Sequence, residues 1–156
     1  KSAGDRRYIN ARSETVFDKP AFRAAARARR CLVPADGFYE WQKTRTGKVP
    51  HFIYLADRQP FGIAGLWETW ERGKDRIETF TLLTTAANEL MQPIHDRMPV
   101  IVKPEQYSLW LDPTVKDRER LGDVLLPYPA EAMAAHPVSP KVNSPANDGP
   151  ELIERV

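Results

Sequence analysis

Residues 31–55 read CLVPADGFYEWQKTRTGKVPHFIYL, and this stretch decides the fold class. The apolar run at 31–35 predicts a strand that ends at the Asp36-Gly37 turn. Residues 38–42 and 51–55 predict two more strands, joined through a turn at Thr46-Gly47. The centre of the chain is therefore expected to form antiparallel sheet.

Strands and short helices are expected on both sides of this stretch. Asp18 and Pro20 suit the start of a helix that runs to about Arg30. The other expected elements are strands at 7–12, 61–67 and 77–84, a helix at 86–91, a strand at 99–102, helices at 105–111 and 116–125, and a strand at 136–142. Without a repeat or a long linker, the pattern predicts one strand-rich, mostly antiparallel α+β domain over residues 1–156.

Composition excludes several classes of protein. Apolar residues make up 42% and charged residues 28% of the 156 residues, which is ordinary globular usage. No apolar run approaches the roughly 18 residues of a membrane span. The single Cys31 excludes an internal disulfide and a cysteine-rich zinc site, so a reducing cytoplasm fits best. Because the chain begins at Lys1 in polar sequence without a methionine, we expect its own N-terminus to lie further upstream.

Positive charge is concentrated at the start of the chain. Residues 1–30 carry nine Lys or Arg against three Asp or Glu, whereas the remaining residues carry 14 against 18. The expected helix after Asp18 would align one basic stripe, made of Lys19, Arg23, Arg27 and Arg30. Such a stripe fits a phosphate backbone, and it equally fits an ordinary solvated helix face.

Glu40 is the first candidate for chemistry. Strand alternation places it on the face of Phe38 and Gln42, with Tyr39 and Trp41 on the other face. A carboxylate among large aromatic side chains is expected to be partly buried, which suits a group that transfers protons. The alternative is an edge-strand glutamate that reaches solvent or pairs with an arginine.

His95 and Asn10 are the other two candidates. His95 lies between Pro93 and Pro99, and a rigid loop can present a histidine for proton transfer near neutral pH. A capping or surface histidine is the alternative. Asn10 is expected on a strand face with Arg12 and Glu14, and its amide can donate and accept hydrogen bonds without titrating.

The sequence contains no motif typical of a metal or cofactor site. The histidines at 51, 95 and 136 are far apart in sequence, and no CxxC, HExxH or glycine-rich phosphate loop occurs. We therefore expect no cofactor and no metal. Cys31 enters an apolar strand pattern, so we interpret it as a small core residue rather than a reactive thiol.

Several motifs, in this order, resemble the SRAP family, the SOS-response-associated peptidases. They are INARSET at 9–15, RCLVPADGFYEW at 30–41, TTAAN at 84–88, HDRMP at 95–99, HPVS at 136–139 and PELIE at 150–154. The resemblance covers essentially the whole chain. It implies a single SRAP domain with a barrel-like fold, of which this chain is the C-terminal majority. The catalytic cysteine would lie in an N-terminal segment upstream of Lys1.

The resemblance also implies a function in the DNA-damage response. Family members guard abasic sites in single-stranded DNA through an N-terminal cysteine, which they expose by self-processing as autoproteolytic peptidases. Its amine and thiol close a thiazolidine on the sugar aldehyde, which is a crosslinking, lyase-type chemistry. The expected partner is single-stranded DNA with abasic sites. The protein would act as a cytoplasmic monomer, associated with the nucleoid when bound to DNA.

Carried over by motif, the resemblance assigns a role to each candidate. Asn10, Glu40 and His95 would be catalytic: Asn10 would hold the cysteine amine or the sugar, while Glu40 and His95 would move protons. Arg12 and Arg97 would bind phosphates, and Trp41 would brace the site or stack on DNA. Some relatives have a basic residue where this chain has Pro20, so Lys19 or Arg23 would take over that phosphate contact.

Two other functions remain open at this point. One is a peptidase that cleaves other proteins, as the family name suggests. The other is a non-catalytic module that binds single-stranded DNA. Peptide turnover that is abolished by Glu40→Gln would favour the peptidase. Salt-dependent DNA binding that is unchanged in Asn10→Ala or His95→Ala would favour the binding module.

Overall fold

The computed structural model describes residues 8–156, which divide into two compact units. Unit 1 comprises the chain up to Val33 together with Gly62–Thr85 and Pro99–Leu126. Unit 2 comprises Pro34–Phe61, Ala86–Met98 and Pro127–Val156. Both units are built mainly of strands, with short helices, which confirms the strand-rich α+β class.

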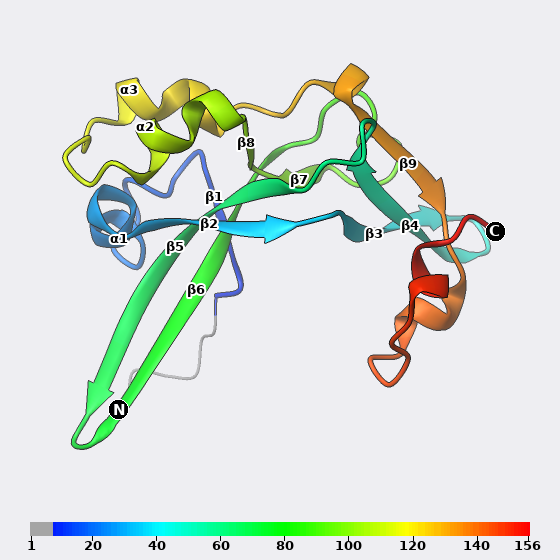
Figure 1. Cartoon of the computed structure of the whole chain (residues 1–156), viewed down its shortest axis with the longest axis horizontal. Helices are drawn as coiled ribbons and strands as arrows, with labels where there is room; N and C mark the ends of the chain where they lie inside the picture. Colours follow the sequence, from blue (N-terminus) through cyan, green and yellow to red (C-terminus); the bar gives the residue numbers. More distant parts are fainter. Residues whose placement is uncertain (1–7) are drawn as a thin grey trace. The chain divides into compact units, whose positions relative to one another are not determined.

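Unit 1 is organised around a sheet with the strand order β1-β6-β5-β2. The strands are β1 (Asn10–Arg12), β2 (Arg30–Ala35), β5 (Phe61–Arg72) and β6 (Asp75–Ala86), and the short β8 (Ile101–Val102) also pairs with β5. Figure 1 shows β5 and β6 as one long hairpin. It extends beyond the expected strands because Glu71 lies opposite Arg76, and Gly73, with φ 63°, closes the turn.

The core of unit 1 lies between this sheet and its helices. These are α1 (Arg23–Ala28), η1 (Pro104–Gln106), α2 (Tyr107–Leu111), α3 (Arg118–Leu121) and η2 (Gly122–Leu125). Trp110, Leu83 and Leu121 are fully buried there. The expected helix at 116–125 starts later than predicted, because Asp117 accepts the Glu119 amide as an N-cap.

The helix expected after Asp18 is shorter than predicted. Asp18 does not cap it, because its carboxylate accepts a 3.1 Å hydrogen bond from Arg118 instead. Residues 15–22 form successive turns, and α1 begins only at Arg23. The strand β1 also ends at Arg12, so Glu14 lies in a turn and not on the strand face predicted for it.

Unit 2 contains an antiparallel sheet of order β3-β4-β9. Its strands are β3 (Phe38–Thr44), β4 (Gly47–Leu55) and β9 (Met133–Pro137). The predicted hairpin at Thr46-Gly47 is confirmed, and its register is continuous from Phe38↔Ile53 to Thr44↔Gly47. One face of the sheet packs Phe52, Tyr54 and Val138 together, with Tyr39 against them.

Two further expectations for unit 2 are wrong. Residues 89–94 form turns and not the helix expected at 86–91, because Ala86 still belongs to β6 and Pro93, which has no amide, stops the turn that Asn88 starts. The strand expected at 136–142 is β9, which ends earlier, at Pro137. It is followed by η4 (Pro140–Asn143), because Ser139 accepts the Lys141 amide and starts a turn.

The remaining elements are η3 (Ala130–Ala132) and η5 (Pro150–Ile153), together with β7 (Arg97–Pro99), which spans the unit boundary at Met98.

Candidate functional site

Glu40 lies in the middle of β3, on the face that also carries Phe38 and Gln42. It is half-buried, as the sequence predicts, and its Oε1 accepts the backbone amide of Trp41 at 3.0 Å. Among residues 8–156, no hydrogen bond occupies the second carboxylate oxygen. Glu40 is therefore held by its own strand in an orientation suited to exchanging a proton with a bound molecule.

His51 lies directly opposite Glu40 in the neighbouring strand β4. Directly opposed residues point to the same face, with Cβ atoms about 5 Å apart. The His51 Nδ1 lies 3.1 Å from the carbonyl oxygen of Val49, to which it donates when protonated, so Nε2 remains for other partners. Sequence reasoning did not assign His51 to this site. Counting back along both strands from the turn would have placed it opposite Glu40.

His95 belongs to a closed loop at residues 87–96. The Ala87 amide donates to the Asp96 carbonyl at 3.1 Å and joins the two ends of the loop. Asn88 anchors its start by donating to the Tyr128 carbonyl at 2.7 Å, while Met91 is fully buried beneath it. The loop is thus held from both sides, in agreement with the rigidity expected from the flanking prolines.

The His95 ring is 42% exposed, and its Nδ1 has partners for both protonation states. In a neutral ring Nδ1 accepts the Arg97 backbone amide at 3.1 Å, whereas a protonated Nδ1 faces the Asp96 carboxylate at 3.2 Å. Within residues 8–156, no hydrogen bond occupies Nε2. His95 can therefore gain or lose a proton without losing its orientation.

A side-chain hydrogen bond ties the Glu40 strand to the His95 loop. The Gln42 side-chain amide donates to the Pro93 carbonyl at 2.9 Å. Gln42 is two residues beyond Glu40 on the same face, and Pro93 is two residues before His95. Both candidate proton-transfer groups thus belong to one braced assembly inside unit 2.

Trp41 points to the opposite face of β3. Its indole Nε1 donates to the Asn143 side chain at 2.7 Å, which fixes the ring against the segment that follows β9. This geometry suits the bracing role expected for Trp41. Arg97 is half-buried immediately after the loop, where its backbone supports His95.

The candidates of unit 1 lie on its surface. Asn10 and Arg12 are exposed on β1, and the intervening Ala11 is buried. Lys19 and Arg23 are also exposed, as is Arg27. Asn10, Arg12, Lys19 and Arg23 are thus accessible to a ligand of unit 1, and their roles stay predictions.

Arg30 is not part of the predicted basic stripe. Its side chain is 7% exposed and donates to the backbone carbonyls of Ala26, Trp110 and Asp112. Burial lowers the pKa of this guanidinium, and the nearby charge of Asp112 opposes that shift. A buried cation is stabilised by such carbonyls, so Arg30 connects α1 to α2 as a structural residue.

Cys31 follows in β2, where it is half-buried. Burial raises the pKa of its thiol, so the neutral form is favoured at physiological pH. This agrees with the interpretation of Cys31 as a packing residue. Within the described residues, no cluster of three metal-binding side chains occurs, and no helix has the length and apolarity to cross a membrane.

Comparison with known proteins gives consistent matches. Residues 1–145 match the family "SOS response associated peptidase (SRAP)". The chain is 46% identical over 150 residues to the abasic site processing protein YoqW of Bacillus subtilis, covering 95% of this chain and 67% of that protein. It is 37% identical to the abasic site processing protein YedK of Escherichia coli, covering 95% and 67%.

More distant relatives and a solved structure agree. The abasic site processing protein HMCES of Gallus gallus is 38% identical, covering 92% of this chain and 49% of that protein. A crystal structure of a protein from Bacteroides thetaiotaomicron superposes with a TM-score of 0.87 at 33% identity, covering 94% of this chain and 65% of that one. The chain thus spans about two thirds of the length of its bacterial relatives and about half of the length of the bird protein.

Proposed function

Because the chain belongs to the SRAP family, we propose that the full-length protein processes abasic sites in single-stranded DNA by forming a covalent crosslink. The names of its relatives support abasic-site processing. The observation that carries the proposal is the braced assembly of unit 2, where Gln42 joins the strand of Glu40 to the loop of His95. In this proposal both units together make one SRAP domain.

The proposed chemistry needs an amine and a thiol on one residue. The amine of an N-terminal cysteine adds to the aldehyde of the ring-opened sugar, and loss of water leaves a Schiff base. The thiol then adds its sulfur to the same carbon, while its proton goes to the nitrogen. One amine, one thiol and one aldehyde give one thiazolidine and one water. Cys31 cannot supply this pair, since its amine is part of a peptide bond and its thiol is held neutral.

Glu40 and His95 are proposed to move the protons of this sequence. Ring opening transfers a proton from the anomeric hydroxyl to the ring oxygen, and Schiff-base formation requires a proton on the leaving hydroxyl. The second oxygen of Glu40 and the Nε2 of His95 suit these transfers, since both groups are otherwise held in place. His95 is assigned to the sugar hydroxyl and Glu40 to ring opening and water loss.

The remaining residues are proposed to hold DNA. Asn10 is assigned to hydrogen-bond the cysteine amine or the sugar, and Arg12 and Arg97 to bind phosphates. Lys19 or Arg23 is assigned to a further phosphate. The peptidase activity of the family is proposed to be self-processing, which releases the N-terminal cysteine from a preceding methionine. The protein is proposed to act as a monomer in the cytoplasm, on nucleoid DNA.

The test uses full-length protein and an oligonucleotide with one abasic site, resolved on a denaturing gel. We expect a covalent band whose rate of formation falls about 100-fold or more in Glu40→Gln and in His95→Ala, which is the usual contribution of a proton-transfer group. Glu131→Gln, an exposed change elsewhere in unit 2, should leave the rate unchanged. Salt-dependent DNA binding without a covalent band would favour the non-catalytic module. Glu40-dependent turnover of a peptide library would favour a peptidase that acts on other proteins.

A further inference from the structure

The tip of the β3–β4 hairpin carries three exposed cations without a partner in the described part of the chain. Lys43, Arg45 and Lys48 are all exposed, and no ion pair among residues 8–156 includes any of them. No acidic residue occurs in the sequence between Glu40 and Asp57. The hairpin therefore presents uncompensated positive charge.

The register makes this charge unfavourable for the hairpin on its own. Lys43 lies directly opposite Lys48, one pair away from the turn. Like charges in this arrangement destabilise a pair of strands. The turn itself is well made, because the Thr44 hydroxyl donates to the Gly47 carbonyl at 2.9 Å and Gly47 adopts a φ of 143°. A rigid turn that holds repelling cations in place indicates a surface built to meet an anion.

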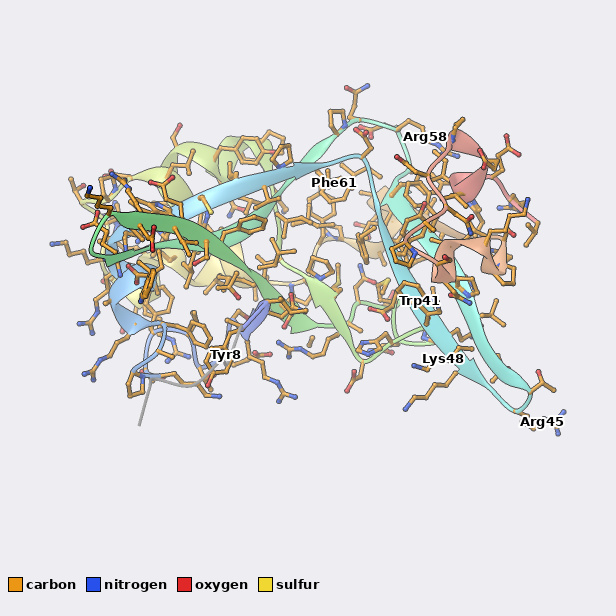
Figure 2. The ribbon with its side chains drawn as sticks, turned by 90° about the horizontal axis from the view of Figure 1, so that it is seen from below. Tyr8, Trp41, Arg45, Lys48, Arg58 and Phe61 are labelled. Carbon is orange, nitrogen blue, oxygen red and sulfur yellow. The ribbon has the colours of Figure 1, made fainter. Side chains whose placement is uncertain are left out.

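The same face of the hairpin carries an aromatic side chain. Strand alternation puts Trp41 on the face of Lys43 and Lys48, two pairs further from the turn. Figure 2 shows Trp41, Lys48 and Arg45 in succession along the hairpin, with Arg45 at its tip. Cations in line with an aromatic ring are typical of surfaces that follow single-stranded nucleic acid.

We propose that this hairpin binds the phosphates of the DNA strand that continues beyond the lesion, with contacts from Lys43, Arg45 and Lys48. The inference rests on the proposed function. Lys43 is three residues, or about 10 Å, from Glu40 along β3. Because β3 is the outer strand of its sheet, a strand of DNA at Glu40 can pass over its edge to the Lys43 face. Proximity to Glu40 favours DNA over an acidic protein as the anion.

The test compares two triple variants of the full-length protein. Lys43→Gln, Arg45→Gln and Lys48→Gln neutralise the hairpin, while Lys74→Gln, Lys103→Gln and Lys116→Gln make the same charge change at exposed sites of unit 1. Binding of an unmodified thymidine oligonucleotide is measured over a range of salt concentrations. We expect the hairpin variant to bind about tenfold more weakly. Its slope of log K against log salt should fall by about 2, since each lost phosphate contact removes about 0.7.

Crosslinking separates this inference from the proposed function. With an abasic oligonucleotide too short to reach the hairpin, the hairpin variant should react as fast as the wild type. With one long enough to reach the hairpin, the variant should react more slowly than the wild type at limiting protein. Equal slowing on both substrates, an unchanged salt slope, or equal weakening in the unit 1 variant would each overturn the hairpin proposal. Absence of any crosslink in the wild type would refute the proposed function, while the salt slopes would still decide for or against the hairpin.

Discussion

The hydrogen bond between Gln42 and the Pro93 carbonyl leads to a quantitative prediction. Gln42→Leu keeps the size of the side chain and removes the donor of this 2.9 Å contact. The exposed Pro93 carbonyl can then bond to water, so the loss is that of one neutral hydrogen bond, about 1 kcal/mol. The loop stays anchored through Asn88 and through the bond from Ala87 to Asp96. We therefore expect a shift in its opening equilibrium of about fivefold, and no unfolding.

Hydrogen exchange measures this shift without reference to activity. The backbone amides of Ile94 and His95 both donate to the Met91 carbonyl at 2.8 Å, so their exchange reports opening of the loop. We expect about fivefold faster exchange at these amides in Gln42→Leu. Gln59→Leu, an exposed change in the same unit, is the control. Unchanged exchange in Gln42→Leu would refute the bracing role of this hydrogen bond.

Three other predictions concern packing within the two units. Arg30→Met leaves three backbone carbonyls without their donor, and we expect a loss of about 3 kcal/mol in the free energy of unfolding, measured with urea. A methyl group on Gly37 would meet the Phe52 ring and lie 2.6 Å from the Ile53 carbonyl oxygen, so Gly37→Ala should cost about 1–3 kcal/mol, seen as a lower Tm; an unchanged Tm would contradict the tight packing. Because burial raises the pKa of Cys31, its alkylation at pH 8 should be slow in the folded protein and at least about tenfold faster in urea. For the same reason the folded state should lose stability as pH rises above the ordinary thiol pKa of about 8.5.

The parts of the fold set by local pattern could be predicted from the sequence. The Thr46-Gly47 turn and the alternation of residues 38–42 gave the hairpin and the partial burial of Glu40. The rigid loop around His95 was also expected from its prolines. The partners that hold these residues were not, because Pro93 and Asn143 are 51 and 102 residues away from the β3 side chains that they accept from. Neither contact leaves a periodic signal.

The wrong predictions share a physical cause. In each, a side chain took up a backbone group or a distant partner that local propensity does not include. Asn88 donated to the distant Tyr128 carbonyl, and Asp18 bonded to Arg118 and not to the start of a helix. Arg30 fits the spacing of a solvated stripe, yet burial against α2 made it a core residue. Such outcomes depend on tertiary packing, which helix periodicity does not encode.

The division of the chain into two units has a consequence for how this domain can be inherited. The polypeptide changes unit after Val33, Phe61, Thr85, Met98 and Leu126. No single cut therefore yields one unit whole, and a recombination event with one breakpoint would leave both incomplete. Glu40 and His95 belong to separate segments of unit 2, at 34–61 and 86–98, so neither can be transferred with its supports alone. The two units are thus expected to pass between genomes only together.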